Sequence, residues 1–128
     1  MYKYMKNVIE KIILTIILVK MFRKRENFSN EINLIDSNKA KNYIKSNYFK
    51  KIIDVRTEEE WNKGHHPSAI HIPIEPIDML TENKIKKLEG PVLIYCRSGR
   101  RALNAAKKIK NSNNIQIYYI NKTYKSLI

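Results

Sequence analysis

The amino-acid sequence predicts an α/β fold with three layers: a mostly parallel central sheet and helices on both of its faces. Two patterns support this prediction. Short, apolar, β-branched runs alternate with helix-like stretches throughout residues 31–128. Polar residues stand at the ends of two of these runs, at Asp54 and at Cys96, and active sites in parallel sheets lie at such strand ends. The 128 residues are enough for one domain with one core.

The first three elements of this domain are predicted to be a strand, a helix and a second strand. Residues 32–35 form a short apolar run. Asp36 or Ser37 can then cap a helix that runs to about Ser46, because their side chains accept hydrogen bonds from the free N–H groups of a first turn. Residues 51–55 (KIIDV) follow as a buried strand.

A short helix and a third strand are expected next. Thr57 is a helix-capping residue, and residues 58–60 are three glutamates, which the positive end of a helix dipole favours. Gly64 should end this helix. Residues 69–72 form an apolar run closed by Pro73, so we predict a strand there.

The second half of the domain continues the alternation. Residues 77–88 predict a helix with three core-facing side chains: Leu80, Ile85 and Leu88. Residues 92–95 (VLIY) are the clearest strand of the chain. A helix over residues 101–110 and a last strand over residues 116–120 complete the order. Crossovers between parallel strands should be right-handed.

Residues 1–30 differ from the rest and are expected to form an apolar, basic helix followed by a linker at residues 27–30. Residues 12–19 (IILTIILV) are flanked by lysines and arginines. This run is short for a transmembrane span, which needs about 20 apolar residues, and no small-residue cleavage site follows it. We expect membrane contact through residues 5–22, by an anchor or by a helix lying on the surface. The alternative is a helix packed on its own domain or on a partner.

The net charge of +13 is spread over both parts of the chain. Such a field attracts anions, so nucleic acid, an anionic membrane and a small anionic substrate are candidate partners. No motif or pattern of stacking aromatic residues supports nucleic acid, and we do not expect it. The flanking charges slightly favour a cytoplasmic domain associated with a membrane through the N-terminal segment. An extracytoplasmic domain would follow if that segment were a signal.

Cys96 is the single cysteine of the chain. It has no partner for an internal disulfide, and no zinc-type spacing of cysteine and histidine occurs. His65 and His66 have no thiol or acid partners at ligand spacing, so no metal site is expected. A lone cysteine is either a small buried hydrophobe or a reactive thiol, and the first is the commoner case.

The neighbours of Cys96 in the sequence favour a reactive thiol. They place it in a turn between a buried strand and a helix, where backbone N–H groups point to a common centre and stabilise a thiolate. Gly99 permits a left-handed backbone angle in that turn. Arg97, Arg100 and Arg101 add three cations. A buried structural cysteine needs none of these features.

Two stretches of the chain resemble the rhodanese-like family. IIDVRTEEEWNKGHHPSAIHIP, residues 52–73, is similar to that family's signature of DVR followed by GHIxGAxxIP. VLIYCRSGRRA, residues 92–102, is similar to its active loop, C-x-x-G-x-R, with Cys96, Gly99 and Arg101 on the fixed positions. The two motifs occur in the family's order.

The resemblance covers about residues 31–120 and implies transfer of sulfane sulfur. Cys96 would take a sulfur atom from a small anionic donor such as thiosulfate, hold it as a persulfide and pass it to cyanide, a thiol or a protein acceptor. The substrate-binding loop would comprise the five residues that follow: Arg97, Ser98, Gly99, Arg100 and Arg101. Arg97 and Arg100 would steer the donor, and Arg101 would turn back to hold the loop. No metal or organic cofactor is implied.

Four residues of the first stretch have a supporting role by the same resemblance: Asp54, Arg56, Glu60 and His65. We expect an Arg56–Glu60 ion pair, and we expect His65 to brace the loop. The chain departs from the family at His66, and Asn121 follows the last strand where a Gly-Gly turn is usual. Asparagine can adopt the left-handed conformation, so that turn is expected to survive.

Two alternative functions remain open. A cysteine phosphatase or arsenate reductase on a related fold has an arginine six residues after the cysteine. Here Arg101 is five residues after Cys96, and the smaller loop suits a sulfur atom better than a tetrahedral phosphate. The second alternative is a membrane-tethered module that delivers sulfur or binds a protein without small-molecule turnover.

Overall fold

The computed structural model of the chain describes residues 2–29, 31–75 and 78–128. In these ranges, five strands form one sheet in the order β1-β5-β4-β2-β3, and all four pairings are parallel. The strands are β1 (Ile32–Leu34), β2 (Lys51–Asp54), β3 (Ala69–His71), β4 (Val92–Tyr95) and β5 (Ile117–Tyr119). Each lies within a run predicted from the sequence, so the prediction of an α/β fold is confirmed.

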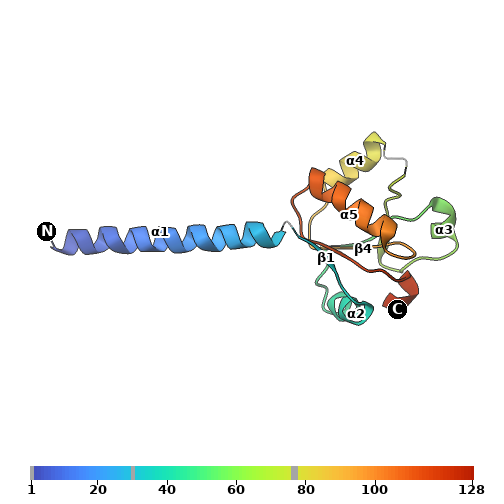
Figure 1. Cartoon of the computed structure of the whole chain (residues 1–128), viewed down its shortest axis with the longest axis horizontal. Helices are drawn as coiled ribbons and strands as arrows, with labels where there is room; N and C mark the ends of the chain where they lie inside the picture. The colour runs from blue at the N-terminus through green and yellow to red at the C-terminus, as the bar shows by residue number, and fades with distance from the viewer. Residues whose placement is uncertain (1, 30, 76–77) are drawn as a thin grey trace.

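Helices cover both faces of this sheet. They are α2 (Ser37–Lys45), α3 (Glu58–Asn62), α4 (Met79–Lys86), α5 (Arg100–Ser112) and the short 3-10 helix η1 (Tyr124–Leu127). In Figure 1, α4 and α5 lie together on one side of the sheet and α2 lies on the other. The three predicted layers are therefore present.

The core consists of two apolar clusters, one on each face of the sheet. Side chains alternate between faces along a strand. In β4, Val92 and Ile94 join the cluster under α4 and α5, whereas Leu93 and Tyr95 join the cluster with α2 and η1. All four are 0% exposed. The alternation places the next residue, Cys96, on the α5 side of the sheet.

Capping residues set where the helices begin, as the sequence predicted for two of them. Asp36 accepts a backbone N–H of the first turn of α2 at 2.9 Å. Thr57 and Glu60 form a capping box at the start of α3. Asp78 caps α4 by accepting the Thr81 N–H at 2.8 Å. These bonds satisfy N–H groups that have no partner within the helix.

The helix predicted over residues 77–88 is shorter in the structure, and residue 77 lies outside the described ranges. Ile85 and Leu88 are buried as predicted, but Leu80 is 71% exposed, so its predicted core position is wrong. Five residues separate Leu80 from Ile85, which turns the two side chains onto different faces of a helix. Thr81, four residues before Ile85, is on the buried face instead.

The N-terminal segment forms one long helix, α1 (Tyr2–Ser29). Figure 1 shows it outside the layered domain. The helix includes residues 27–29, so the predicted linker at 27–30 is wrong for these three, and residue 30 lies outside the described ranges. In the part of the chain that the structure describes, no helix has both the length and the apolar character needed to cross a membrane.

Candidate active site

The turn that holds Cys96 connects the buried strand β4 to the helix α5. Gly99 ends the turn as the N-cap of α5 and has a φ of 98°, a left-handed angle that L side chains rarely adopt. A Cβ atom at this position would also lie 2.9 Å from the Cα of Asn121. Both the backbone angle and the close approach require glycine, which fixes the path of the loop around Cys96.

The sulfur of Cys96 lies at the N-terminus of α5. Its Sγ accepts hydrogen bonds from the backbone N–H of Gly99 at 3.1 Å and from that of Ala102 at 3.4 Å. Cys96 is 1% exposed. Two N–H donors and the positive end of a 13-residue helix surround the sulfur, an arrangement that stabilises negative charge on it.

Arg101 connects this loop to α3. Its Nη1 and Nη2 donate to the two carboxylate oxygens of Glu60 at 2.6 Å and 2.9 Å. Glu60 also accepts from the Thr57 hydroxyl and backbone N–H in the capping box. The hydrogen bond from Arg101, with the bonds from Thr57, lowers the pKa of Glu60 from 4.5 to about 2. The ion pair therefore holds the start of α5 against α3.

Arg56 does not pair with Glu60, so that expectation was wrong. Its guanidinium instead forms an ion pair with Asp54, with an Nη2–Oδ2 distance of 2.8 Å, and Nη2 also donates to the carbonyl of Gly64 at 2.6 Å. Arg56 precedes the capping residue of α3, so the spacing of four to Glu60 is not a helical spacing. Although burial opposes its charge, the bonds and charge of Asp54 raise the pKa of Arg56.

Two histidines of the first motif, His65 and His71, lie beside Trp61. The rings of Trp61 and His65 are stacked with centroids 3.4 Å apart, and His65 Nδ1 is 3.0 Å from the Trp61 carbonyl oxygen. His65 thus braces α3, the helix whose Glu60 pairs with Arg101. The sequence prediction missed His71, which stacks on the same indole and contacts the Arg56 carbonyl at 2.7 Å.

Asn121 does not adopt the left-handed conformation that was expected of it. Among the described residues other than glycine, only Asn47 has a positive φ. The chain after β5 therefore passes Gly99 without the left-handed turn that a Gly-Gly pair would give. The loop fits because Gly99 presents no side chain to the backbone of Asn121.

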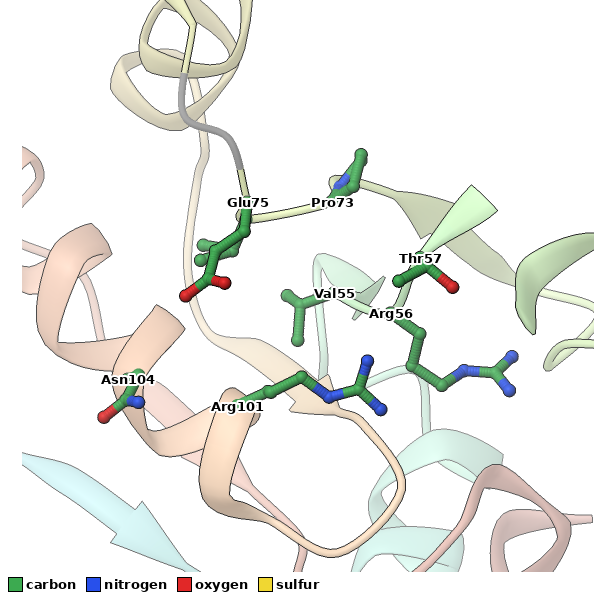
Figure 2. Close-up of a pocket in the computed structure, with 8 residues that line it drawn as sticks. Val55, Arg56, Thr57, Pro73, Glu75, Arg101 and Asn104 are labelled. Atoms are coloured by element: carbon green, nitrogen blue, oxygen red, sulfur yellow. The ribbon is translucent and has the colours of Figure 1, made fainter. Parts of the chain in front are cut away.

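A pocket of about 70 Å³ lies beside the loop. Its lining residues are Val55, Arg56, Thr57, Pro73, Ile74, Glu75, Arg101 and Asn104. Figure 2 shows Arg101 reaching from α5 toward the segment after β2, with Glu75 on the other side of the pocket. The sequence prediction missed Glu75 and Asn104. Glu75 could have been found because it follows β3, whose carboxyl end lies at the same edge of the sheet as that of β2.

The remaining loop residues named from the sequence lie on the surface. Arg97, Ser98 and Arg100 are exposed, whereas Arg101 is half-buried against Glu60. Of the four predicted supporting residues, Asp54 and Arg56 pair below the pocket and Glu60 holds Arg101. No cluster of three or more metal-ligating side chains occurs within the described residues.

Comparison with known proteins assigns the family. The model of the rhodanese-like domain family matches residues 28–127. The chain belongs to the rhodanese-like domain family. A Drosophila melanogaster protein, "Rhodanese domain-containing protein CG4456", is 33% identical over 81 residues, which cover 52% of this chain and 73% of that protein.

A second relative of this rhodanese-like chain has a name that refers to sulfur. The Bacillus subtilis (strain 168) "Putative sulfur carrier protein YrkF" is 37% identical over 59 residues, and the match spans 46% of this chain and only 31% of that protein. A protein of Arabidopsis thaliana with a known solution structure is 19% identical, with 78% of this chain and 91% of that chain covered and a TM-score of 0.49. The family match is to the rhodanese-like domain, and the reference to sulfur is part of the bacterial protein's own name.

The Glu60–Arg101 pair makes the stability of this rhodanese-like domain depend on pH in a defined window. The pKa of Glu60 is lowered in the folded state, so its contribution is present above pH 4.5 and is lost as the pH falls from 4.5 toward 2. We expect the free energy of unfolding, measured with urea, to fall less across this window in Glu60→Gln than in the unchanged chain.

The control for this prediction is Glu59→Gln. It removes the same charge from the same helix, but Glu59 pairs with Lys63 at an exposed site, where an ion pair contributes little. It should leave the slope across the window unchanged. Equal slopes for Glu60→Gln and the unchanged chain would contradict the role assigned to the pair.

Proposed function

We propose that the chain is a sulfurtransferase that carries sulfane sulfur as a persulfide on Cys96. The observation that supports this most is the position of the Cys96 sulfur at the N-terminus of α5, where it accepts the N–H groups of Gly99 and Ala102. Such donors stabilise a thiolate before the reaction and a persulfide anion after it. Sulfur chemistry at this position agrees with the family to which the chain belongs.

The proposed reaction has two displacement steps. The Cys96 thiolate attacks the outer sulfur of thiosulfate, the bond between the two thiosulfate sulfurs breaks, and sulfite leaves with its electron pair. A new Sγ–S bond holds the transferred atom as a persulfide anion. An acceptor thiolate or cyanide then attacks that outer sulfur, the Sγ–S bond breaks, and the Cys96 thiolate is restored. Neither step needs a metal or an organic cofactor.

The charge of the donor is proposed to be met by Arg97 and Arg100. Both are exposed on the loop, whereas the two arginines that line the pocket already have carboxylate partners. Arg56 is paired with Asp54, and Arg101 is paired with Glu60. The positive electrostatic potential around a guanidinium is weaker when a carboxylate neutralises it. An exposed guanidinium that is not in an ion pair therefore attracts a diffusing anion more strongly.

A protein acceptor is the second candidate for the last step. The sulfur of Cys96 is almost completely buried, and the pocket of about 70 Å³ that Arg101 of its loop lines is small. An extended segment of a partner protein that carries a thiol could reach the buried sulfur, whereas a bulky acceptor could not. The name of the Bacillus subtilis relative agrees with delivery of sulfur to a carrier.

The proposed function is tested by turnover with thiosulfate and cyanide. We expect thiocyanate to form with the unchanged chain, and we expect no hydrolysis of an aryl phosphate. Hydrolysis of the phosphate without thiocyanate formation would favour a cysteine phosphatase on the related fold. If thiocyanate is absent and a small thiol also fails to remove the sulfur from a loaded chain, the alternative of sulfur delivery to a protein holds.

Removing the two exposed arginines should weaken the donor step selectively. In Arg97→Gln/Arg100→Gln, we expect the KM for thiosulfate to rise about tenfold at low salt, with a smaller rise at high salt and little change in kcat. The control is Lys107→Gln/Lys110→Gln, which removes two exposed charges further along α5. An equal rise of KM in both double variants would show that only the overall charge matters.

A further inference from the structure

Helix α1 exposes far more apolar surface than a soluble domain normally presents. Its large apolar side chains with described surroundings are each between 44% and 60% exposed: Met5, Val8, Ile9, Ile12, Ile13, Leu14, Ile16, Ile17, Leu18, Val19 and Met21. None of them belongs to either core cluster of the domain. A helix with this surface requires a partner that covers it.

The length of the apolar band argues against a helix that crosses a bilayer. Residues 12–19 are apolar except for Thr15, whose hydroxyl donates to the carbonyl of Lys11 at 2.8 Å. These eight residues span about 12 Å of helix, whereas the hydrocarbon core of a bilayer is about 30 Å thick. Lys11 directly precedes this band and Lys20 directly follows it, so the apolar band cannot be extended at either end without including a charge.

One stripe of the helix continues the apolar surface beyond this band. Met5, Ile9, Ile12, Ile16 and Val19 are spaced four, three, four and three residues apart, so they share one face over about 21 Å of helix. All five are about half exposed. Such a stripe can insert into the surface of a lipid bilayer along its whole length. The eight residues of the central band cover only part of that length.

The charges of the segment indicate what covers this stripe. Residues 1–30 contain seven lysines and arginines and two glutamates, and the whole chain has a net charge of +13. A second copy would bring two strongly positive helices together. An anionic lipid surface would instead neutralise the same charges while the apolar stripe leaves water.

We infer that α1 lies in the interface of an anionic membrane, with the stripe from Met5 to Val19 turned inward, and holds the sulfur-transfer domain at that surface. The lysines beside the stripe then lie at the level of the lipid headgroups, where long basic side chains extend their charges toward water. This docking does not depend on the chemistry of Cys96. Either proposal can therefore fail without the other.

Vesicle sedimentation of the full chain tests this docking. The probes are vesicles of phosphatidylcholine alone and of an equal mixture of phosphatidylcholine and phosphatidylglycerol. We expect binding to the mixed vesicles to be at least about tenfold stronger and to weaken as salt rises. Equal binding to both vesicles, or binding to neither, would overturn the proposal.

A pair of triple variants assigns the binding to the stripe. Ile9→Asn/Ile12→Asn/Ile16→Asn removes three stripe residues and should lower binding at least about tenfold. The control, Leu34→Asn/Met79→Asn/Leu80→Asn, removes three residues of the domain that are 52%, 78% and 71% exposed. It should bind as the unchanged chain does. Equal losses in both variants would overturn the assignment to α1. A cooperative urea unfolding transition of each variant checks that the domain is folded.

Two measurements distinguish the other occupants of the stripe. Sedimentation velocity without lipid should give a monomer; a dimer that is lost in the α1 triple variant would assign the stripe to a second copy and overturn the proposal. Washing bound vesicles with alkaline carbonate should release the chain, as expected for a helix in the interface. Retention after the wash would show a spanning helix and would also overturn it.

Discussion

Replacing Cys96 with serine is expected to reduce thiocyanate formation at least about a thousandfold, because the hydroxyl is a far weaker nucleophile toward sulfur than a thiolate. The change is nearly isosteric, and the serine oxygen can still accept the N–H groups of Gly99 and Ala102. The free energy of unfolding should therefore change by less than about 1 kcal/mol. Turnover and urea unfolding of the same preparation measure the two effects separately.

A matched variant moves the thiol within the same loop. Cys96→Ser/Ser98→Cys keeps one cysteine but moves it from the buried position that accepts the N–H groups of Gly99 and Ala102 to an exposed position. It should be as inactive as Cys96→Ser. If either variant were nearly as active as the unchanged chain, sulfur transfer would not depend on a thiol at the N-terminus of α5.

The second large effect is expected for Arg56→Met. Asp54 is 0% exposed, and the Arg56 guanidinium is its ion-pair partner. Methionine would leave the carboxylate buried without that partner, which costs about 3–5 kcal/mol. Urea unfolding at neutral pH should show this loss, and the pocket that Arg56 lines should be disturbed with it.

The control is the double variant Asp54→Asn/Arg56→Met. The amide removes the buried charge but can still accept the backbone N–H of residue 56, which donates to Asp54 at 2.9 Å in the unchanged chain. Part of the lost stability should therefore return. A single variant that loses less than about 1 kcal/mol, or a double variant no more stable than the single one, would contradict the role assigned to this pair.

The strands and helix starts could be predicted because their signals are local. The four residues of β4 are apolar since both faces of the sheet are covered, and this is visible in the sequence without any tertiary information. Thr57 and Glu60 bond to one another within a single turn. The position of Cys96 between a strand and a helix also follows from adjacent residues alone, so the candidate nucleophile could be identified before the fold was known.

The ion pairs could not be predicted, because they join residues that only the folded chain brings together. Arg101 and Glu60 lie 41 positions apart, and their contact depends on how α3 packs against the start of α5. Arg56 lies four residues from Glu60, but the chain turns at Thr57 and directs Arg56 to Asp54 instead. Burial of Leu80 was predicted wrongly for a different reason: its separation of five residues from Ile85 puts the two side chains on different faces of α4.

The intact mass of the chain after treatment with thiosulfate tests persulfide formation on Cys96 most directly. We predict a gain of one sulfur atom, about 32 Da, that is removed by a thiol acceptor and is absent from Cys96→Ser. No gain in the unchanged chain, or the same gain in Cys96→Ser, would contradict the proposal that Cys96 carries the sulfur.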